Sequence, residues 1–599
     1  MSLVATLVKP SPVAERRTVI RAHGVQWLIL LGYLAAAVLL TWRLWADPAA
    51  RVQVGDTQDV NLFAWFMRYE ATAVVHGRLP ALATTAMNPP QGISLMWNTS
   101  LLLPGMLLTP VTLLAGPQVA LTVLLTLGFA GSAASLMWVL RRWGASLTAA
   151  ALGGAVYGFS PALLNSGIGH YNLQFAVLPP LLVHALLRLL TGRDGALRAG
   201  AWLGLLTVAQ LFTGEELLTD TALAGLVLTV TLAAAAPRAA AARAGRVLAG
   251  LATAGAVTLL LAGPAMWAQF RGPLRERYVA RYGHYFSYLS AHPGVFVTAP
   301  GDLLFHTRAS AAAAASYPSH LSEYLAYLGW PPLAGLVIAV IWGWPDRRVR
   351  VSAVTFAALE LLSLDDQYPF LPSHWLHALP MLGQLIPDRL SILADGAAGA
   401  VLAFALDRAR ATAARPAIHA RAARLGGRVA GAAAVLAVVP LIPLPLPAAP
   451  VTALPAGWHA AFARLRLAPS APVLVVPIPA SKFTEVMRWQ ADTGEPGSLV
   501  GGYFLGPGPG RATRVSPDLA TLDAEYLDPL WAGRRPMLSR TAAQIRADLR
   551  LWHPAAVVEV LRWHSAARAV LAAILGRPTF RRGRLLVWRL RRKTPAARR

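Results

Sequence analysis

The chain has 599 residues, of which 56% are hydrophobic and only 14% are charged, and it contains no cysteine. Soluble domains carry about 25% charged residues, so the composition favours a membrane protein, and the lack of cysteine excludes disulfides, thiolate catalysis and cysteine-based zinc sites. The net charge of +26 comes almost entirely from arginines. They cluster between apolar runs, which indicates a membrane orientation signal and argues against nucleic-acid binding.

The first apolar run, Val25–Leu44, follows basic residues between Lys9 and Arg21. It is too long for the core of a signal peptide, and no small-residue cleavage site follows it. We therefore expect a retained span, with residues 1–24 as a cytoplasmic tail.

Ten further apolar runs are each near the length of a membrane span. Arginines fall in alternate connections between them, which supports about eleven spans with the N-terminus inside and the C-terminus outside. The segment 101–116 is broken by prolines, and we expect it to be re-entrant or interfacial. The ten runs lie near residues 118–140, 147–164, 172–190, 199–216, 217–236, 247–267, 324–344, 351–364, 388–407 and 429–446.

The predicted fold class is a polytopic α-helical membrane protein with a C-terminal α/β domain. The transmembrane part covers residues 25–446 and includes large outer loops near 47–117, 269–323 and 365–388. After the proline-rich "VPLIPLPLPAAP", short apolar runs alternate with amphipathic ones. This pattern predicts an extracytoplasmic α/β domain over residues 447–599, whose basic tail "RRKTPAARR" is expected to be disordered.

The stretch "VGDTQDVNLFAW" opens the first outer loop and carries Asp56 and Asp59. The residues that follow have the spacing of an amphipathic helix on the outer membrane surface. In one interpretation Asp56 or Thr57 caps this helix, and Asp59 lies in its first turn, where the helix dipole favours an acid. In the other, the pair carries chemistry, because it lies at the membrane face where an acid can meet a lipid-linked substrate.

The order of these features resembles the GT-C superfamily of membrane glycosyltransferases, in particular its bacterial members. The resemblance rests on a first span with its N-terminus inside, an outer loop with "GDTQD" and "MNPPQG", many spans and a C-terminal α/β domain. Shorter similarities are "YGFSPALLNSGIGHYNLQFAVLPPLL", "IPDRLSIL" and "VLVVPIP…MRWQADTG…VGGYF".

This resemblance implies an inverting transfer of a sugar from a polyprenyl-phosphate donor to a glycan, lipid or protein acceptor of the cell envelope. The reaction would take place at the outer face of the cell membrane. An acid of the first outer loop, here Asp56 or Asp59, would act as general base or help to hold a divalent metal ion such as Mg²⁺ or Mn²⁺. The D-x-x-D spacing departs from the D-D, D-E or single acid of many members and does not select between the two.

Other substrate-binding candidates lie at predicted outer helix ends. His170 and Asn172 belong to "GIGHYNLQ", and Glu215 and Glu216 belong to "FTGEELLTD". Acids beside spans are costly and are often functional. The alternative is an outer turn with a structural histidine and solvated acids.

Basic residues of the second outer loop are candidates for clamping the donor phosphate, with a surface helix on anionic headgroups as the alternative. Arg389 opens a span at the outer face, where it would reach a lipid phosphate or pair with Asp388. The second-loop candidates are Arg271, Arg275, Arg281 and His284.

Two other function classes stay open: a lipid or polysaccharide transporter, and a non-catalytic envelope scaffold of the same fold. A transporter predicts ionisable residues at mid-span along a pathway. The clearest acids here lie near predicted outer ends, which favours the enzyme.

Overall fold

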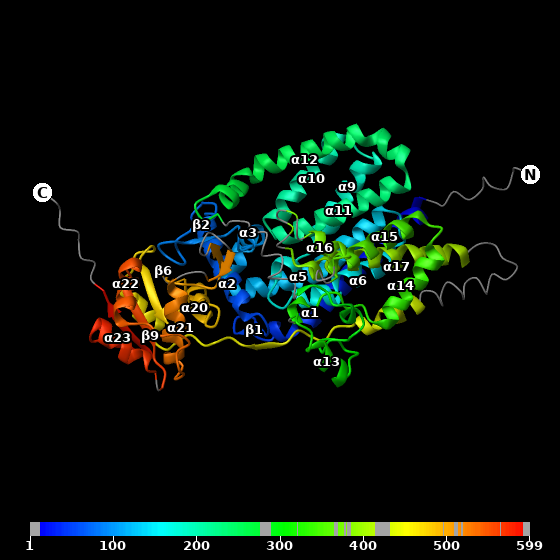
Figure 1. Cartoon of the computed structure of the whole chain (residues 1–599). Coiled ribbons are helices and arrows are strands. Elements are labelled where there is room, and N and C mark those ends of the chain that lie inside the picture. The colour runs from blue at the N-terminus through cyan, green and yellow to red at the C-terminus, as the bar shows by residue number, and fades with distance from the viewer. Residues whose placement is uncertain are drawn as a thin grey trace, which may run out of the picture.

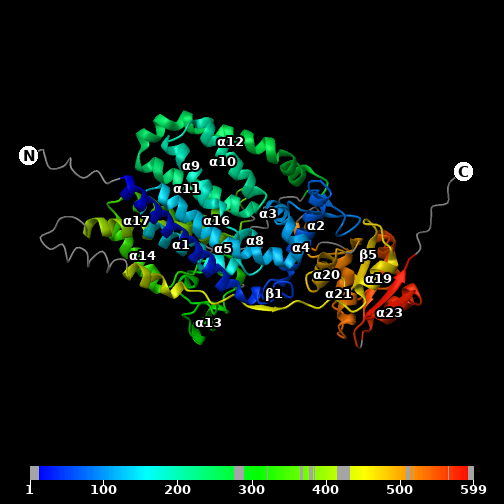
Figure 2. The same ribbon diagram turned by 180° about the vertical axis from the view of Figure 1, so that it is seen from behind.

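The computed structural model describes residues 12–275, 289–319, 321–364, 369–376, 379, 382, 385–413, 432–494, 496–507, 513–516, 519–563 and 565–590. A long bundle of helices forms one part of the molecule, and a unit of strands and helices lies at one end of it (Figure 1). In the view from behind, the first helix runs along the bundle from the N-terminal end toward this unit (Figure 2).

Five helical segments are long and apolar enough to cross a membrane: Gly24–Trp45 of α1 (Pro12–Trp45), α5 (Pro117–Arg142), α11 (Glu215–Ala235), α12 (Pro237–Arg271) and Pro387–Thr412, which joins η6 (Pro387–Leu390) to α17 (Ser391–Ala413). Shorter helices complete the bundle: α6 (Leu147–Gly158), α9 (Leu178–Thr191), α10 (Ala196–Leu211), α14 (Trp330–Gly343), α15 (Arg347–Ser363) and the apolar segment Ala432–Leu441. The chain is an α-helical membrane protein, and the span count of about eleven stays a prediction.

The structure differs from the expected continuous runs over 147–164 and 172–190. The first run ends at Gly158, and two short helices, α7 (Pro161–Ser166) and α8 (Tyr171–Gln174), come before α9. Ser160 starts α7, because its hydroxyl accepts a hydrogen bond from the Leu163 N–H and a proline follows at the first helical position. The turn between α7 and α8 carries His170.

The first outer loop folds against the bundle. It contains β1 (Arg51–Gln53), α2 (Thr57–Val75), β2 (Ala83–Thr84), β3 (Ile93–Ser94), α3 (Leu102–Leu107) and α4 (Thr109–Ala115). The helix expected after Asp59 is present as α2, but the prediction that it lies on the membrane surface was wrong, because residues 60–67 are all buried. A partner from far along the chain, α20 (Glu485–Thr493), packs against α2.

Short elements of the later predicted outer regions lie against the bundle, except α13, which projects from it (Figure 1). Ala291 donates its N–H to the Ser363 carbonyl at the end of α15, and Leu304 donates to Ile442. These two hydrogen bonds hold residues 291–304 against the bundle. The short elements are η3 (Pro293–Phe296), α13 (Arg308–Ala314), η4 (Leu321–Glu323), α16 (Pro372–Leu376) and η7 (Val439–Leu441).

Residues after 447 fold around a five-stranded mixed sheet with the order β10-β11-β9-β5-β6. Its central strands β5 (Pro472–Val476) and β9 (Ala556–Val560) are parallel, with Val475 opposite Val558. Both are almost entirely buried, as their runs of β-branched residues predict for strands covered on two faces. The remaining elements are β4 (Ala448–Pro450), α19 (Trp458–Leu465), β6 (Ser498–Leu499), β7 (Leu505–Pro507), β8 (Thr513–Val515), α21 (Leu519–Trp531), α22 (Ala542–Trp552), α23 (Ala567–Leu575), β10 (Phe580–Arg582) and β11 (Leu585–Arg589).

Two strand contacts join this α/β unit to the first outer loop. β1 pairs antiparallel with β4, with Val52 opposite Ala449. Met87, in the turn "MNPPQG", forms a parallel bridge with Leu499 of β6. The α/β unit therefore shares backbone hydrogen bonds with the loop that carries Asp56 and Asp59.

Candidate active site

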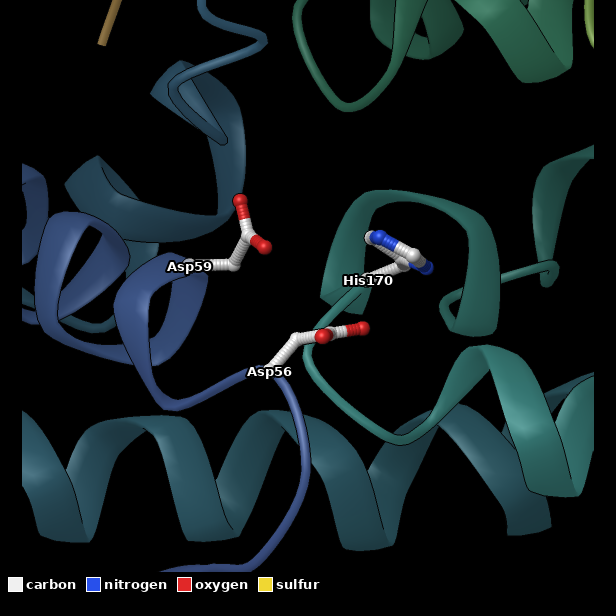
Figure 3. A group of neighbouring side chains, drawn as sticks. All are labelled: Asp56, Asp59 and His170. Atoms are coloured by element: carbon white, nitrogen blue, oxygen red, sulfur yellow. The ribbon is translucent and has the colours of Figure 1, made fainter. Parts of the chain in front are cut away.

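Asp56, Asp59 and His170 meet where the first outer loop joins the bundle. One ligand atom from each residue lies within 4.8 Å of the other two, and all three side chains are half-buried. Figure 3 shows the three side chains turned toward a common space, with the two acids at the start of α2 and His170 on the neighbouring turn. The structure thus brings together three of the residues singled out in the sequence.

The approach of the two segments depends on Gly169. Its φ of +99° suits glycine, and a Cβ atom there would lie 2.8 Å from the Asp56 Cβ. Any side chain at this position would push His170 away from Asp56. The glycine before His170 is therefore part of the site's geometry.

Asp56 occupies the N-cap position of α2 but makes no capping hydrogen bond with the backbone N–H groups of this fully described helix. The Thr57 hydroxyl donates to the Gly55 carbonyl outside the helix. Asp56 is therefore the N-cap residue, as one interpretation expects, but neither its side chain nor that of Thr57 makes a capping hydrogen bond. Because the Asp56 carboxylate is not used as a cap, it is available to the common space.

Asp59 lies in the first turn of α2, as expected. The pKa of its carboxyl is raised to about 6, mainly by burial and also by the nearby Asp56, while His170 and Arg389 act to lower it. Burial, together with the charges of Asp59 and Asp56, raises the pKa of Tyr503 in the α/β unit. Asp59 is therefore a carboxyl group that changes charge near physiological pH.

His170 is backed by Glu323, the last residue of η4. Its Nδ1 lies 3.6 Å from the Glu323 Oε1, a separation suited to an ion pair once the imidazole is protonated. Glu323 is buried, with 4% of its surface exposed. Because the Nδ1 makes no hydrogen bond at this distance, Glu323 acts on the imidazole through its negative charge.

Arg389 anchors Glu323 from the other side. Its Nε lies 3.0 Å from the Glu323 Oε2, and one terminal nitrogen bonds the Oε1, which makes a two-point contact. The other terminal nitrogen bonds Glu216. Arg389 thus pairs with two acids, whereas the Asp388 Oδ2 accepts the Leu325 N–H at 3.1 Å.

Glu215 and Asn172 lie near this network without joining it directly. The Glu215 carboxylate accepts a hydrogen bond from the Gln269 amide, near the end of α12. Asn172 is buried in α8, and its carbonyl oxygen would lie 2.7 Å from a Cβ at Gly214. Glu215 and Asn172 therefore belong to the surroundings of the site, on α11 and α8 respectively.

The basic residues of the second outer loop are only partly described. Arg271 is exposed at the end of α12, and Arg275 donates to the Gly272 carbonyl at 3.4 Å. Arg281 and His284 lie outside the described residues. A phosphate clamp in this loop stays a prediction.

Two residues of the site were missed in the sequence, Glu323 and Tyr503. Glu323 is a lone acid just before an apolar run, the same signal that singled out Glu215 and Glu216. Tyr503 belongs to "VGGYF", which the sequence analysis gives only as part of a similarity to the GT-C superfamily, without a role for the tyrosine. No local pattern marks it as a neighbour of Asp59.

The donor set fits a divalent cation. Two carboxylates and one imidazole supply oxygen and nitrogen ligands of the kind that Mn²⁺ and related ions accept. Glu323 lies behind His170, where metal-bound histidines often have a carboxylate, but its Oε1 is 3.6 Å from the Nδ1 and the pair makes no hydrogen bond. Asp56, Asp59 and His170 are therefore the residues that would hold such an ion.

The same arrangement is suited to proton transfer from a bound hydroxyl group. A general base must reach the proton that it removes, and its pKa must lie near the working pH. Asp59, whose pKa is raised to about 6, meets the second condition, and the half-buried Asp56 and His170 lie beside it.

The solved structures that are similar to this chain include the following three. The arabinofuranosyltransferase AftD from Mycobacteria matches 89% of this chain with a TM-score of 0.50 and 15% identity. The oligosaccharyltransferase AglB from Archaeoglobus fulgidus, solved with an inhibitory peptide and a dolichol-phosphate, matches 89% of this chain and 69% of its own length, with a TM-score of 0.47 and 10% identity. ArnT from Cupriavidus metallidurans matches 95% of this chain and 98% of its own, with a TM-score of 0.45 and 13% identity.

The likeness to AftD shows the fold of this chain, which spans 35% of the length of AftD. No protein-family model and no curated protein sequence matches the chain.

Proposed function

We propose that this chain, which has the fold of the GT-C membrane glycosyltransferases, transfers a sugar from a polyprenyl-phosphate donor to a cell-envelope acceptor at the outer membrane face. The observation that carries the proposal is the convergence of Asp56, Asp59 and His170 within 4.8 Å. The site lies where membrane helices meet the α/β unit, so a donor held in the membrane and an acceptor outside it have access to the same place.

In the proposed reaction, Asp56 accepts the proton of the acceptor hydroxyl as its oxygen attacks the anomeric carbon. The bond from that carbon to the donor phosphate breaks, and polyprenyl phosphate leaves with the bonding electron pair. One displacement of this kind inverts the anomeric configuration. A divalent cation at the site would supply positive charge for the departing phosphate.

Asp56 is the better base of the two acids. Asp59 is surrounded by groups that act on its charge, among them Tyr503, His170 and Arg389. The Asp56 Oδ1 has a long contact, 3.4 Å, from the Gln58 amide. Asp59 and His170 then orient the reacting groups, with Glu323 and Arg389 behind them.

The placement of buried acids supports an enzyme over a transporter. Asp220, Glu360 and Asp395 are buried in α11, α15 and α17. Each lies within a few residues of the helix end that faces the site, and none of these three lies at the middle of its helix. A transport pathway requires ionisable groups further along the bundle.

The direction of the chain supports an outer α/β unit. α1 begins at the end of the bundle far from this unit and ends beside β1 (Figure 2). If α1 crosses the membrane with its basic start inside, the site and the α/β unit lie outside.

The test is a donor panel with the purified protein in proteoliposomes. Labelled polyprenyl-phosphate hexoses and pentoses are compared with the matching nucleotide sugars, with membrane-envelope extract as acceptor. We expect release of polyprenyl phosphate from at least one lipid donor and no turnover of nucleotide sugars. Turnover of nucleotide sugars alone, or of no donor at all, would contradict the proposal.

A further inference from the structure

The turn between α9 and α10 and the start of α12 lie at the end of the bundle opposite the α/β unit (Figure 1). The other end of α12 reaches the first outer loop, where the Gln269 carbonyl accepts a hydrogen bond from the Trp97 indole at 3.1 Å. At 1.5 Å per residue, Arg246 lies about 35 Å from Gln269 along α12. This surface is therefore well separated from the candidate active site.

Two arginines of α12 converge on the turn at Gly192. This residue ends α9 as its C-cap, with a φ of +75°, a left-handed conformation that favours glycine. A Cβ atom at Gly192 would lie 3.7 Å from the Nε of Arg243 and 3.7 Å from the Nε of Arg246. Both guanidinium groups therefore lie over the same turn, and the glycine leaves this side of the turn free of a side chain.

The turn itself does not neutralise these two charges. Its acid, Asp194, is already paired with Arg188, which donates to the Asp194 Oδ1 at 2.5 Å. The Arg246 Nε is buried and has no hydrogen-bond partner, and Arg243 makes a long hydrogen bond, 3.4 Å, to the Ala239 carbonyl of its own helix. Because buried polar groups in folded proteins are normally hydrogen-bonded, this arrangement is suited to an anion from outside the chain.

The helices that carry this turn and these arginines also present apolar surface. α10 and α12 pack closely, because a Cβ at Gly200 would lie only 2.2 Å from the Gly250 carbonyl oxygen. Beside this contact, Leu197 of α10 is 70% exposed and Leu248 of α12 is 65% exposed. In a membrane protein such side chains contact the tails of lipids. An anion with apolar tails therefore matches this surface better than a free anion does.

We propose that Arg243, Arg246 and the turn at Gly192 bind the phosphate of an anionic phospholipid from the membrane leaflet at this end of the bundle. The planar guanidinium groups offer forked N–H donors that fit phosphate oxygens, and the lipid tails lie along α10 and α12. Basic groups between membrane helices attract anionic headgroups in this way. The inference does not depend on the proposed glycosyl transfer.

The test is lipid binding by the purified full-length protein in detergent, measured by native mass spectrometry. The probe is dioleoylphosphatidylglycerol, and dioleoylphosphatidylcholine has the same tails without the net negative charge. We expect the wild type to bind phosphatidylglycerol at least tenfold more tightly. Arg246→Gln should weaken this binding about fivefold. The matched control is Arg238→Gln, which removes an exposed arginine from the same helix and should bind as the wild type does.

A second readout is the melting temperature, which phosphatidylglycerol should raise in the wild type and in Arg238→Gln, but not in the double variant Arg243→Gln/Arg246→Gln. Equal affinity for the two lipids would overturn the inference. Equal weakening by Arg238→Gln and Arg246→Gln would also overturn it, because attraction would then be diffuse. Inorganic phosphate provides the last arm, and its binding as tightly as phosphatidylglycerol would show a site for a free anion and contradict the assignment to a lipid.

Discussion

His170 and Glu323 lie next to each other in the site, with 3.6 Å between the imidazole Nδ1 and a carboxylate oxygen. Glu323 is in turn held at both oxygens by Arg389. A chain of contacts therefore leads from a buried arginine in η6, just before α17, to the ring that faces Asp56 and Asp59. Replacing Glu323, the middle residue of this chain of contacts, tests the effect of the contacts on the site.

Replacing Glu323 with Gln keeps its shape and removes its charge. Because His170 loses its anionic partner, we expect transfer activity to fall about 10- to 100-fold, as for other carboxylates behind site histidines. The melting temperature should also fall, since Arg389 keeps only one charged partner. The measurement is donor turnover together with a thermal melt in detergent.

The control for this change is Glu485→Gln, which removes an acid in the first turn of α20 whose charge acts on Asp528 of α21. It should keep wild-type activity. An active Glu323→Gln variant with an unchanged melt would show that the contact with His170 has no role in the site.

Gly169 tests the packing of the site. The Gly169→Ala variant places a methyl group 2.8 Å from the Asp56 Cβ, which moves His170 away from the acids. A misplacement of about 1 Å in an active site costs about 100-fold in rate. Steady-state turnover measures the loss.

Gly116→Ala is the matched control for Gly169→Ala. Gly116 also has a positive φ, +94°, but open space surrounds the position of its Cβ. Both variants carry the strain of a positive φ, about 1–3 kcal/mol, and only the first crowds the site. Equal activity in the two variants would contradict the importance of the contact with Asp56.

The rate should depend on pH through Asp59, whose pKa is raised to about 6. Both an orienting acceptor and a cation ligand must be the carboxylate form, so activity is retained above pH 6 and lost below it. We expect kcat/KM to fall about tenfold per pH unit below 6. Because protons and cations compete for the same group, saturating Mn²⁺ should move this limb to lower pH. A flat profile from pH 4.5 to 8 would contradict this role.

The sequence predicted those parts of the fold and site that depend on local patterns. Apolar runs located the helices of the bundle, and Asp56, Asp59 and His170 stood out because acids and a histidine lie at predicted outer ends. Contacts between distant segments could not be predicted. Arg389 and Glu216 are 173 positions apart, and the bond from Asn61 to Thr484 joins residues 423 positions apart.

The environment of α2 also depends on a distant segment and could not be predicted from the local sequence. Its periodicity predicts one apolar face, and the sequence alone leaves the other face to solvent or lipid. In the structure Asn61, Trp65 and Arg68 reach from α2 to α20, so a polar face is buried by a polar partner. Hydrophobic periodicity reports which side is apolar, but it does not report what covers the polar side.

The predicted topology is testable by labelling, because the chain has no native cysteine. A single cysteine replacing Trp563, which is 88% exposed in the α/β unit, should react with an impermeant maleimide in intact cells. A cysteine replacing the exposed Arg243 at the start of α12 should react only after the cells are permeabilised. The reverse pattern would place the site on the cytoplasmic side and contradict transfer at the outer face.

The most direct test of the central claim is single-turnover release of polyprenyl phosphate by the Asp56→Asn variant, measured on protein saturated with a donor that the wild type uses. The control is Asp47→Asn, which changes an exposed acid at the start of the same loop. A base that acts on the acceptor hydroxyl contributes about 100- to 10,000-fold, so we predict a loss of that size in Asp56→Asn, with donor binding unchanged and full activity in the control. Release at the wild-type rate by Asp56→Asn would contradict the assignment of this site as the centre of glycosyl transfer.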